Sequence, residues 1–219
     1  MNNHRYDAIV IGGGHNGLVN AAYLAKAGKR VLVLERRHIV GGATITEEIY
    51  PGFKYLIGSY LISLLRPEVI QELELMKHGL EIMPLESTFV PLLDGNYLAD
   101  WPDHDATKHE IARHSKRDAE AYDEYSRTMR RLALALRPLL DMIPPDPSSV
   151  TAGDLATMAK VANVFDQLRE DDLYLLARLM TMSAGDFLDE WFECTPLKGT
   201  KATSGIIGTF MGPRTPGTG

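Results

Sequence analysis

A glycine-rich segment near the start of the chain has the residue types and spacing that bind a dinucleotide. Gly12, Gly14 and Gly17 fit the pattern G-x-G-x-x-G. In this pattern the first glycine makes the tight turn out of a strand, the second lets the backbone approach a pyrophosphate, and the third lets a helix pack closely on the strand. The helix N-terminus then offers N–H groups and its positive dipole end to the phosphates. We expect cofactor contacts from all six residues, Gly12, Gly13, Gly14, His15, Asn16 and Gly17, with His15 acting through its backbone.

An acidic residue stands at the distance that a ribose contact requires. Glu35 follows Gly14 by 21 residues and comes directly after an apolar run. A carboxylate at this position accepts hydrogen bonds from ribose hydroxyls and repels a 2′-phosphate. Glu35 therefore argues against NADP at this site.

The segments around these residues have the patterns of a strand, a helix and a second strand. Residues 7–11 form a short apolar run typical of a strand buried in a parallel sheet. Residues 17–27 suit a helix that Gly28 ends, and residues 31–34 are a second apolar run. Together they predict one right-handed βαβ unit. An ordinary glycine-rich turn is the weaker interpretation, because the whole context of the fingerprint is present.

FAD and NAD share this fingerprint, and a second glycine pair distinguishes them. Gly41 and Gly42 follow the acidic residue and the basic pair Arg36 and Arg37. Adjacent glycines expose backbone N–H groups, and an arginine neutralises phosphate charge. Further cofactor contacts are expected from Arg36, Arg37, Gly41, Gly42, Ala43 and Thr44.

These motifs resemble those of a known family. Arg-x-x-x-Gly-Gly after a ribose-binding glutamate is the pattern of FAD-containing amine oxidases and phytoene desaturases; here it begins at Arg37, or at Arg36 if the loop is one residue longer. Residues 51–55, 183–192 and 208–218 also resemble the phytoene-desaturase-like branch, so the likeness covers essentially the whole chain.

The resemblance implies an FAD-dependent oxidoreductase, a flavoprotein that passes hydride from an apolar or amine substrate to flavin. It names no catalytic residue, because the flavin carries the redox chemistry. Members of this family are much longer and have a second FAD-contacting segment near the C-terminus. We therefore expect the 219 residues to be the N-terminal part of a longer protein, and the isolated chain to lack the full activity.

The expected fold is α/β, with a Rossmann-like FAD-binding βαβ unit in residues 1–100 and a mainly helical substrate or cap region in residues 101–219. The parallel strands are too few for a complete doubly wound sheet. A hairpin insertion is predicted from strands at residues 89–93 and 97–99 around the turn residues 94–96.

Other elements are predicted from local patterns. Residues 59–65 and 67–77 read as helices, and residues 80–83 as a strand. Ser115 and Asp118 resemble a capping box at the start of a long amphipathic helix. Three further helices are expected over residues 154–168, 171–182 and 186–192.

Composition excludes several classes of protein. Hydrophobic residues are 45% and charged residues 24%, as in globular proteins. The net charge of −6 gives no footprint for nucleic acid. The lone Cys194 excludes an internal disulfide and a CxxC pair, and is expected to be a packing residue.

We find no transmembrane segment, signal peptide or transit peptide, and expect a cytoplasmic protein with a small-molecule, lipophilic substrate. The sequence does not indicate an oligomeric state.

Two residue groups have alternative readings. His104, His109 and His114 are five residues apart, which places them on different helix faces, so no metal site is expected. The Leu- and Met-rich segments 129–140 and 173–182 read mainly as core; a substrate tunnel or peripheral membrane contact is the alternative.

Two alternatives to the flavin enzyme stay open. A nicotinamide-dependent dehydrogenase would use the same fingerprint, although the second glycine pair with its arginines argues against it. A non-catalytic nucleotide-binding module would retain the fold as an interaction scaffold.

Overall fold

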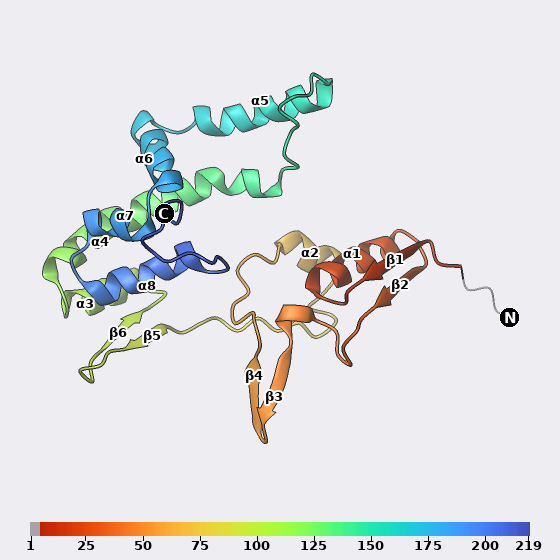
Figure 1. Ribbon diagram of the computed structural model, residues 1–219, viewed down its shortest axis with the longest axis horizontal. Helices are drawn as coiled ribbons and strands as arrows, with labels where there is room; N and C mark the ends of the chain where they lie inside the picture. Colours follow the sequence, from red (N-terminus) through yellow and green to blue (C-terminus); the bar gives the residue numbers. More distant parts are fainter. Residues whose placement is uncertain (1–4) are drawn as a thin grey trace. The chain divides into compact units, whose positions relative to one another are not determined.

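The computed structural model describes residues 5–219, and the chain divides into two compact units (Figure 1). The first unit ends at Pro84, and the second runs from Leu85 to Gly219. The sequence places the boundary after residue 100, whereas this division falls before the hairpin of residues 88–100, which therefore belongs to the helical unit. The cofactor and substrate roles expected for the two regions stay predictions.

The first unit begins with the predicted βαβ arrangement. Strand β1 (Ala8–Ile11) leads through the glycine loop into helix α1 (His15–Lys26), and strand β2 (Val31–Leu34) returns beside β1. The two strands are parallel, with Ala8 opposite Val31 and Ile11 opposite Leu34. The α/β fold with a Rossmann-like unit is confirmed, and the sheet of β1 and β2 is small, as expected.

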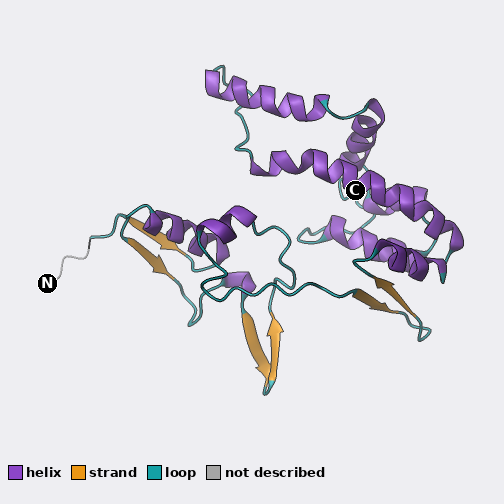
Figure 2. Cartoon of the chain, turned by 180° about the vertical axis from the view of Figure 1, so that it is seen from behind, coloured by secondary structure: helices purple, strands orange, loops and turns teal. Residues whose placement is uncertain are grey.

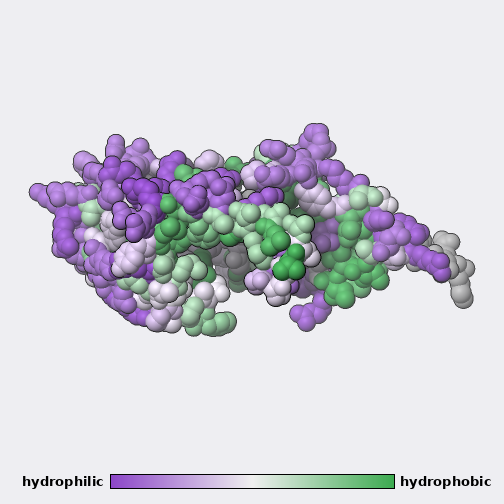
Figure 3. Space-filling model, turned by 90° about the horizontal axis from the view of Figure 1, so that it is seen from above, coloured by the Kyte–Doolittle hydropathy of each residue, from purple (hydrophilic) through white to green (hydrophobic). Residues whose placement is uncertain are grey.

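Apolar side chains of this small sheet remain exposed. Ile9 is 58% and Ile11 is 88% exposed, and Leu34 on the neighbouring strand is also exposed. Figure 3 shows apolar residues gathered over this part of the first unit. Strands of a parallel sheet are normally covered on both faces, so this sheet is incomplete within the described residues.

The hairpin in the first unit was not predicted. Strands β3 (Thr46–Tyr50) and β4 (Phe53–Leu56) pair antiparallel around Gly52, whose φ is +84°. Glu48 accepts a hydrogen bond from the Gly52 N–H at 2.8 Å and supports the turn. Pro51-Gly52 is a turn signal that the sequence carries, but the strands beside it are too short and exposed to give a clear pattern.

Three other predictions for the first unit are corrected. Residues 59–65 form no helix, and residues 80–83 form no strand. A strand needs a partner, and none lies beside residues 80–83 in the structure as described. Helix α2 (Pro67–Glu72) begins at the expected proline but ends before residue 77, in a series of turns.

The second unit consists of one hairpin and many helices (Figure 2). Strands β5 (Thr88–Pro91) and β6 (Tyr97–Asp100) pair antiparallel around the predicted turn, where Gly95 has a φ of +82°. Most predicted helices are present within a few residues of their expected bounds, and α8 was not predicted. The helical elements are α3 (His104–Ala112), α4 (Lys116–Leu136), the 3-10 helix η2 (Arg137–Asp141), α5 (Ala152–Asp166), α6 (Glu170–Thr181), α7 (Ala184–Trp191) and α8 (Thr195–Ile206).

The core of the second unit joins α4, α6, α7 and α8. Leu132 and Leu179 from the two Leu- and Met-rich segments are buried in it, next to Phe187 and Phe192. Cys194 is partly buried against the same cluster, in agreement with a packing role. Other members of these segments, including Met180, are exposed. In the part of the chain that the structure describes, no helix combines the length and the apolarity needed to cross a bilayer.

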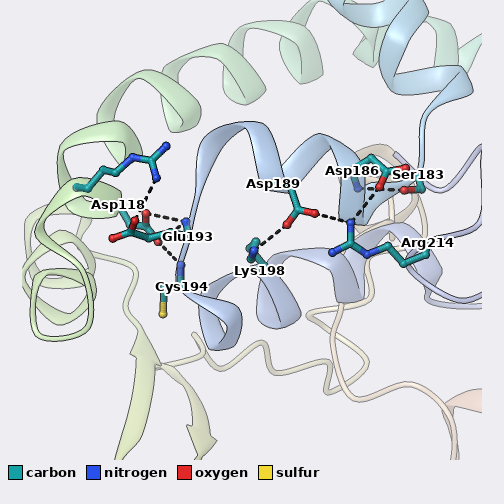
Figure 4. A network of polar contacts seen from close by, with 9 residues as sticks. Asp118, Ser183, Asp186, Asp189, Glu193, Cys194, Lys198 and Arg214 are labelled. Atoms are coloured by element: carbon teal, nitrogen blue, oxygen red, sulfur yellow. Dashed lines mark hydrogen bonds and ion pairs between the residues drawn. The ribbon is translucent and has the colours of Figure 1, made fainter.

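A buried carboxylate connects α4 with the start of α8. Asp118 has no exposed surface, and it accepts hydrogen bonds from the N–H of Glu193 at 2.9 Å and of Cys194 at 2.8 Å (Figure 4). Ser115 caps α4 as predicted, accepting from the Asp118 N–H at 3.1 Å. The capping-box prediction is therefore right for Ser115, but the Asp118 side chain serves a distant segment.

The last residues of the chain pack on α7 and α8. Arg214 forms ion pairs with Asp186 at 3.0 Å and with Asp189, which also binds Lys198 at 2.7 Å (Figure 4). A Cβ on Gly205 would lie 2.0 Å from the carbonyl oxygen of Thr218, so these residues approach α8 at backbone distance. Residues 212–219 are therefore an integral part of the second unit.

Candidate dinucleotide-binding site

The first glycine loop has the geometry that its pattern predicts. Gly12 has a φ of +101° and donates its N–H to the Leu34 carbonyl at 2.8 Å, which ties the turn to β2. Gly14 is the N-cap residue of α1, and no side chain caps this end. The first N–H groups of a helix have no intrahelical acceptor, so α1 begins with donors suited to an anion.

Gly17 stands where the helix approaches the strand most closely. A Cβ at this position would lie 2.2 Å from the Gly12 carbonyl oxygen and 3.3 Å from a Val10 methyl group. Any side chain here would push α1 away from β1. This is the close helix–strand packing that the third glycine of the fingerprint provides.

The two glycine motifs contact each other through their backbones. The Gly41 N–H donates to the Gly13 carbonyl at 2.7 Å, and Gly14 and Gly41 form a parallel bridge. A Cβ on Gly42, whose φ is +62°, would lie 2.8 Å from the Gly14 Cα. The sequence placed both motifs in one site, and the structure brings them together.

Glu35 lies at the end of β2 and contacts the glycine loop directly. Its Oε2 accepts from the Gly13 N–H at 2.7 Å, and its Oε1 from the Arg37 N–H at 2.9 Å. These backbone hydrogen bonds, Arg37 first, hold the pKa of Glu35 below its ordinary value, and the nearby charge of Arg36 acts in the same direction. The carboxylate is therefore ionised at neutral pH and suited to accept from hydroxyl groups.

The remaining predicted residues lie around this centre. His15 and Asn16 are exposed in the first turn of α1. Ala43 and Thr44 belong to the 3-10 helix η1 (Gly42–Thr44), where the Thr44 hydroxyl donates to the Gly41 carbonyl at 2.8 Å. The local hydrogen bond holds the shape of the second glycine turn.

One residue of the site was missed by sequence reasoning. The guanidinium of Arg37 forms an ion pair with Glu47 of β3. The signal that would have indicated Glu47 is the hairpin turn at residues 51–52, because it places β3 beside the second glycine loop. Without that hairpin, Glu47 reads as an ordinary surface carboxylate.

Two histidines of the second unit, His104 and His114, have ordinary partners. His104 lies 2.9 Å from Asp123 and stacks on Tyr122, and His114 contacts the Tyr97 carbonyl at 2.9 Å. Lys108 also binds Asp123, and these two partners lower the pKa of that carboxylate. Among the described residues, no group of three or more potential ligands is arranged to hold a metal ion.

Comparisons with known proteins agree with this geometry. Residues 10–73 match the family described as "NAD(P)-binding Rossmann-like domain". Over 228 aligned residues, the chain is 42% identical to "Pyridine nucleotide-disulfide oxidoreductase domain-containing protein 2" of Rattus norvegicus, covering 98% of this chain and 39% of that protein. It is 41% identical over 120 residues to a limonene dehydrogenase subunit from Castellaniella defragrans, covering 54% and 22%.

A solved structure of a putrescine oxidase triple mutant, from a redesign of its cofactor binding, gives a TM-score of 0.49 at 20% identity, covering 90% of this chain and 36% of that one. The chain spans about two fifths of the length of the first curated relatives that it matches. Residues 10–73 thus match the NAD(P)-binding Rossmann-like family, within a chain that is similar over nearly its whole length to pyridine nucleotide-disulfide oxidoreductase domain-containing protein 2.

Proposed function

We propose that the first unit binds the ADP half of FAD, and that the protein is an FAD-dependent oxidoreductase. The diphosphate would lie at the N-terminus of α1, between the loop of Gly12–Gly17 and the turn at Gly41 and Gly42. Glu35 would accept hydrogen bonds from the adenosine ribose. When bound, FAD supplies the hydride-accepting flavin ring, and the residues of this unit bind and orient its nucleotide half.

The contact between the two glycine motifs carries this proposal. A Cβ on Gly42 would lie 2.8 Å from the Gly14 Cα, so Gly42 has no room for a side chain toward the first glycine loop. Backbone N–H groups from both motifs can therefore face one diphosphate. A second glycine turn held against the first is more than the dinucleotide fingerprint alone requires, and it favours FAD over a nicotinamide cofactor.

The names of the relatives support an oxidoreductase more broadly. One relative belongs to a limonene dehydrogenase, and another is named as a pyridine nucleotide-disulfide oxidoreductase domain protein. The lone Cys194, partly buried, does not suit disulfide chemistry within this chain. We propose hydride transfer from an apolar or amine substrate to flavin, with the helical region of residues 101–219 contributing to the substrate side.

A nicotinamide-dependent dehydrogenase is the second candidate, because the matching family is described as NAD(P)-binding. Titrating the chain with FAD and with NADH, each followed by its own fluorescence, separates the two. The FAD proposal predicts saturable flavin binding and a visible flavin spectrum after removal of free ligand. Saturable NADH binding without flavin binding would favour the second candidate, and binding of neither would contradict both.

A further inference from the structure

Arg37 lies at the ribose end of the proposed cofactor site. Its N–H donates to Glu35 Oε1 at 2.9 Å, and the Gly13 N–H donates to the other carboxylate oxygen at 2.7 Å. The carboxylate proposed to bind the ribose is therefore one hydrogen bond away from Arg37. In dinucleotide-binding folds, an arginine close to this position is the residue that accommodates a 2′-phosphate.

The guanidinium of Arg37 is already occupied by a carboxylate from another element. Its Nη2 donates to Glu47 Oε1. Glu47 is held in β3, where it pairs with Tyr55 of β4. The antiparallel register fixes its backbone, and its side chain is less exposed than that of Arg37, at 31% against 41%. A 2′-phosphate would have to compete with Glu47 for the charge of Arg37.

The remaining charges do not replace Arg37. Arg36 is close enough to Glu35 to lower the pKa of that carboxyl, so its charge already balances a carboxylate. The charges of Arg36 and Arg37 are thus matched in number by those of Glu35 and Glu47. A 2′-phosphate, with close to two negative charges, would enter a region without net positive charge and beside the ionised Glu35.

We propose that Glu47 is a specificity-determining residue of the dinucleotide site. By pairing with Arg37, it withholds that guanidinium from a 2′-phosphate, so the site selects dinucleotides with a free 2′-hydroxyl. The inference rests on the proposed function, because it takes Glu35 as the ribose partner. Glu35 repels the phosphate, and Glu47 removes the group that would attract it; specificity of this kind comes from disfavouring the wrong ligand.

Two probes that differ only in the 2′-phosphate test this role. The full chain and its Glu47→Gln variant are titrated with ADP-ribose and with 2′-phospho-ADP-ribose. The wild-type chain should prefer ADP-ribose. In Glu47→Gln the released guanidinium can form a charge-assisted hydrogen bond to the phosphate, which corresponds to about fivefold to tenfold tighter binding of the phosphorylated probe. The affinity for ADP-ribose should stay within about twofold, because Glu35 and the glycine loops are unchanged.

Glu48→Gln is the matched control, since Glu48 is the next residue on the same strand and binds the Gly52 N–H instead of Arg37. It should keep the wild-type preference. The double variant Glu47→Gln/Arg37→Gln should lose the gain of Glu47→Gln, because the gain depends on the guanidinium. Normal ADP-ribose binding with an unchanged preference in Glu47→Gln would overturn the inference alone. A wild-type chain that binds neither probe would overturn the proposed function, and the inference with it.

Discussion

A Cβ on Gly42 would lie 2.8 Å from the Cα of Gly14, so the two glycine motifs are in backbone contact although 28 residues separate them in the chain. The bridge between Gly14 and Gly41 beside this contact keeps the two turns in register. The diphosphate site that we propose depends on this contact. If a methyl group on Gly42 pushed the second glycine turn away, its N–H groups would no longer lie at the same place.

Gly42→Ala should weaken nucleotide binding, and Gly28→Ala should not. Both glycines have positive φ, +62° and +79°, so alanine in either costs about 1–2 kcal/mol of stability. Only at Gly42 would the added Cβ meet backbone, since nothing lies within 4 Å of it at Gly28. We expect ADP affinity to fall at least about tenfold in Gly42→Ala alone, as measured by calorimetric titration. Equal losses in both variants would show that the contact does not matter.

Gly17→Ala should destabilise the first unit without any backbone strain. Its Cβ would lie 2.2 Å from the Gly12 carbonyl oxygen, so α1 must move away from β1 at a cost of about 1–3 kcal/mol. Gly199 in α8 is the control, because it lies in a helix with nothing within 4 Å of an added Cβ. Gly199→Ala should raise stability by about 0.5–1 kcal/mol. Thermal unfolding followed by circular dichroism measures both, and a stable Gly17→Ala would be incompatible with the close packing.

The elements predicted correctly are those with strong local signals. The strand–glycine–helix–strand run of residues 7–34 combines apolar runs with punctuating glycines, and Ser115 has the residue type and position of a cap. The β3–β4 hairpin was missed because its strands are short and exposed. Helix α8 was missed because it is rich in Gly and Thr, which are poor helix formers. Their formation depends on tertiary contacts that no local pattern contains.

Only the features of the site that depend on local sequence were predicted. The motif spacing identifies Glu35 and both glycine pairs, but not the hydrogen bond from the Gly13 N–H to Glu35. The partner of Arg37 depends on which strand lies beside the second loop, and that is set by the unpredicted hairpin. In the second unit, the Asp118 side chain reaches residues 193 and 194, far beyond the range of a capping pattern.

Asp118→Asn should destabilise the second unit far more than Asp123→Asn, although both residues lie in α4. Asp118 is fully buried and accepts from two N–H groups at the start of α8. The NH2 group of an asparagine at this position would point at backbone N–H groups, which are also donors. The buried hydrogen bond lost in this way costs about 2–3 kcal/mol of stability. Asp123 is 38% exposed, and loss of its ion pairs should cost less than about 1 kcal/mol. Urea unfolding measures both, and similar midpoints for the two variants would argue against a structural role for the buried carboxylate.

The contribution of Arg214 should disappear in acid. Arg214, followed by Lys198, lowers the pKa of Asp189 to about 2 from its ordinary 3.8. A lowered pKa means that the stabilising contribution is present above the ordinary value and is lost as the pH falls through the lowered one. Arg214→Gln should therefore reduce the urea midpoint at pH 7, and this difference from the wild-type chain should shrink between pH 4 and pH 2.

Arg127→Gln removes an exposed pair with Glu124 and serves as the control, with a small effect at every pH. If the difference between Arg214→Gln and the wild-type chain were as large at pH 2 as at pH 7, packing of the arginine side chain on Gly185 would explain its effect instead.

The most direct test of the cofactor site is a calorimetric titration of the full chain with ADP and, separately, with adenosine. If the two glycine turns and the N-terminus of α1 hold the diphosphate, ADP should bind at least about a hundredfold more tightly than adenosine, since several N–H groups contact the phosphates. Equal affinities for ADP and adenosine, or no binding of ADP, would contradict the assignment of this site.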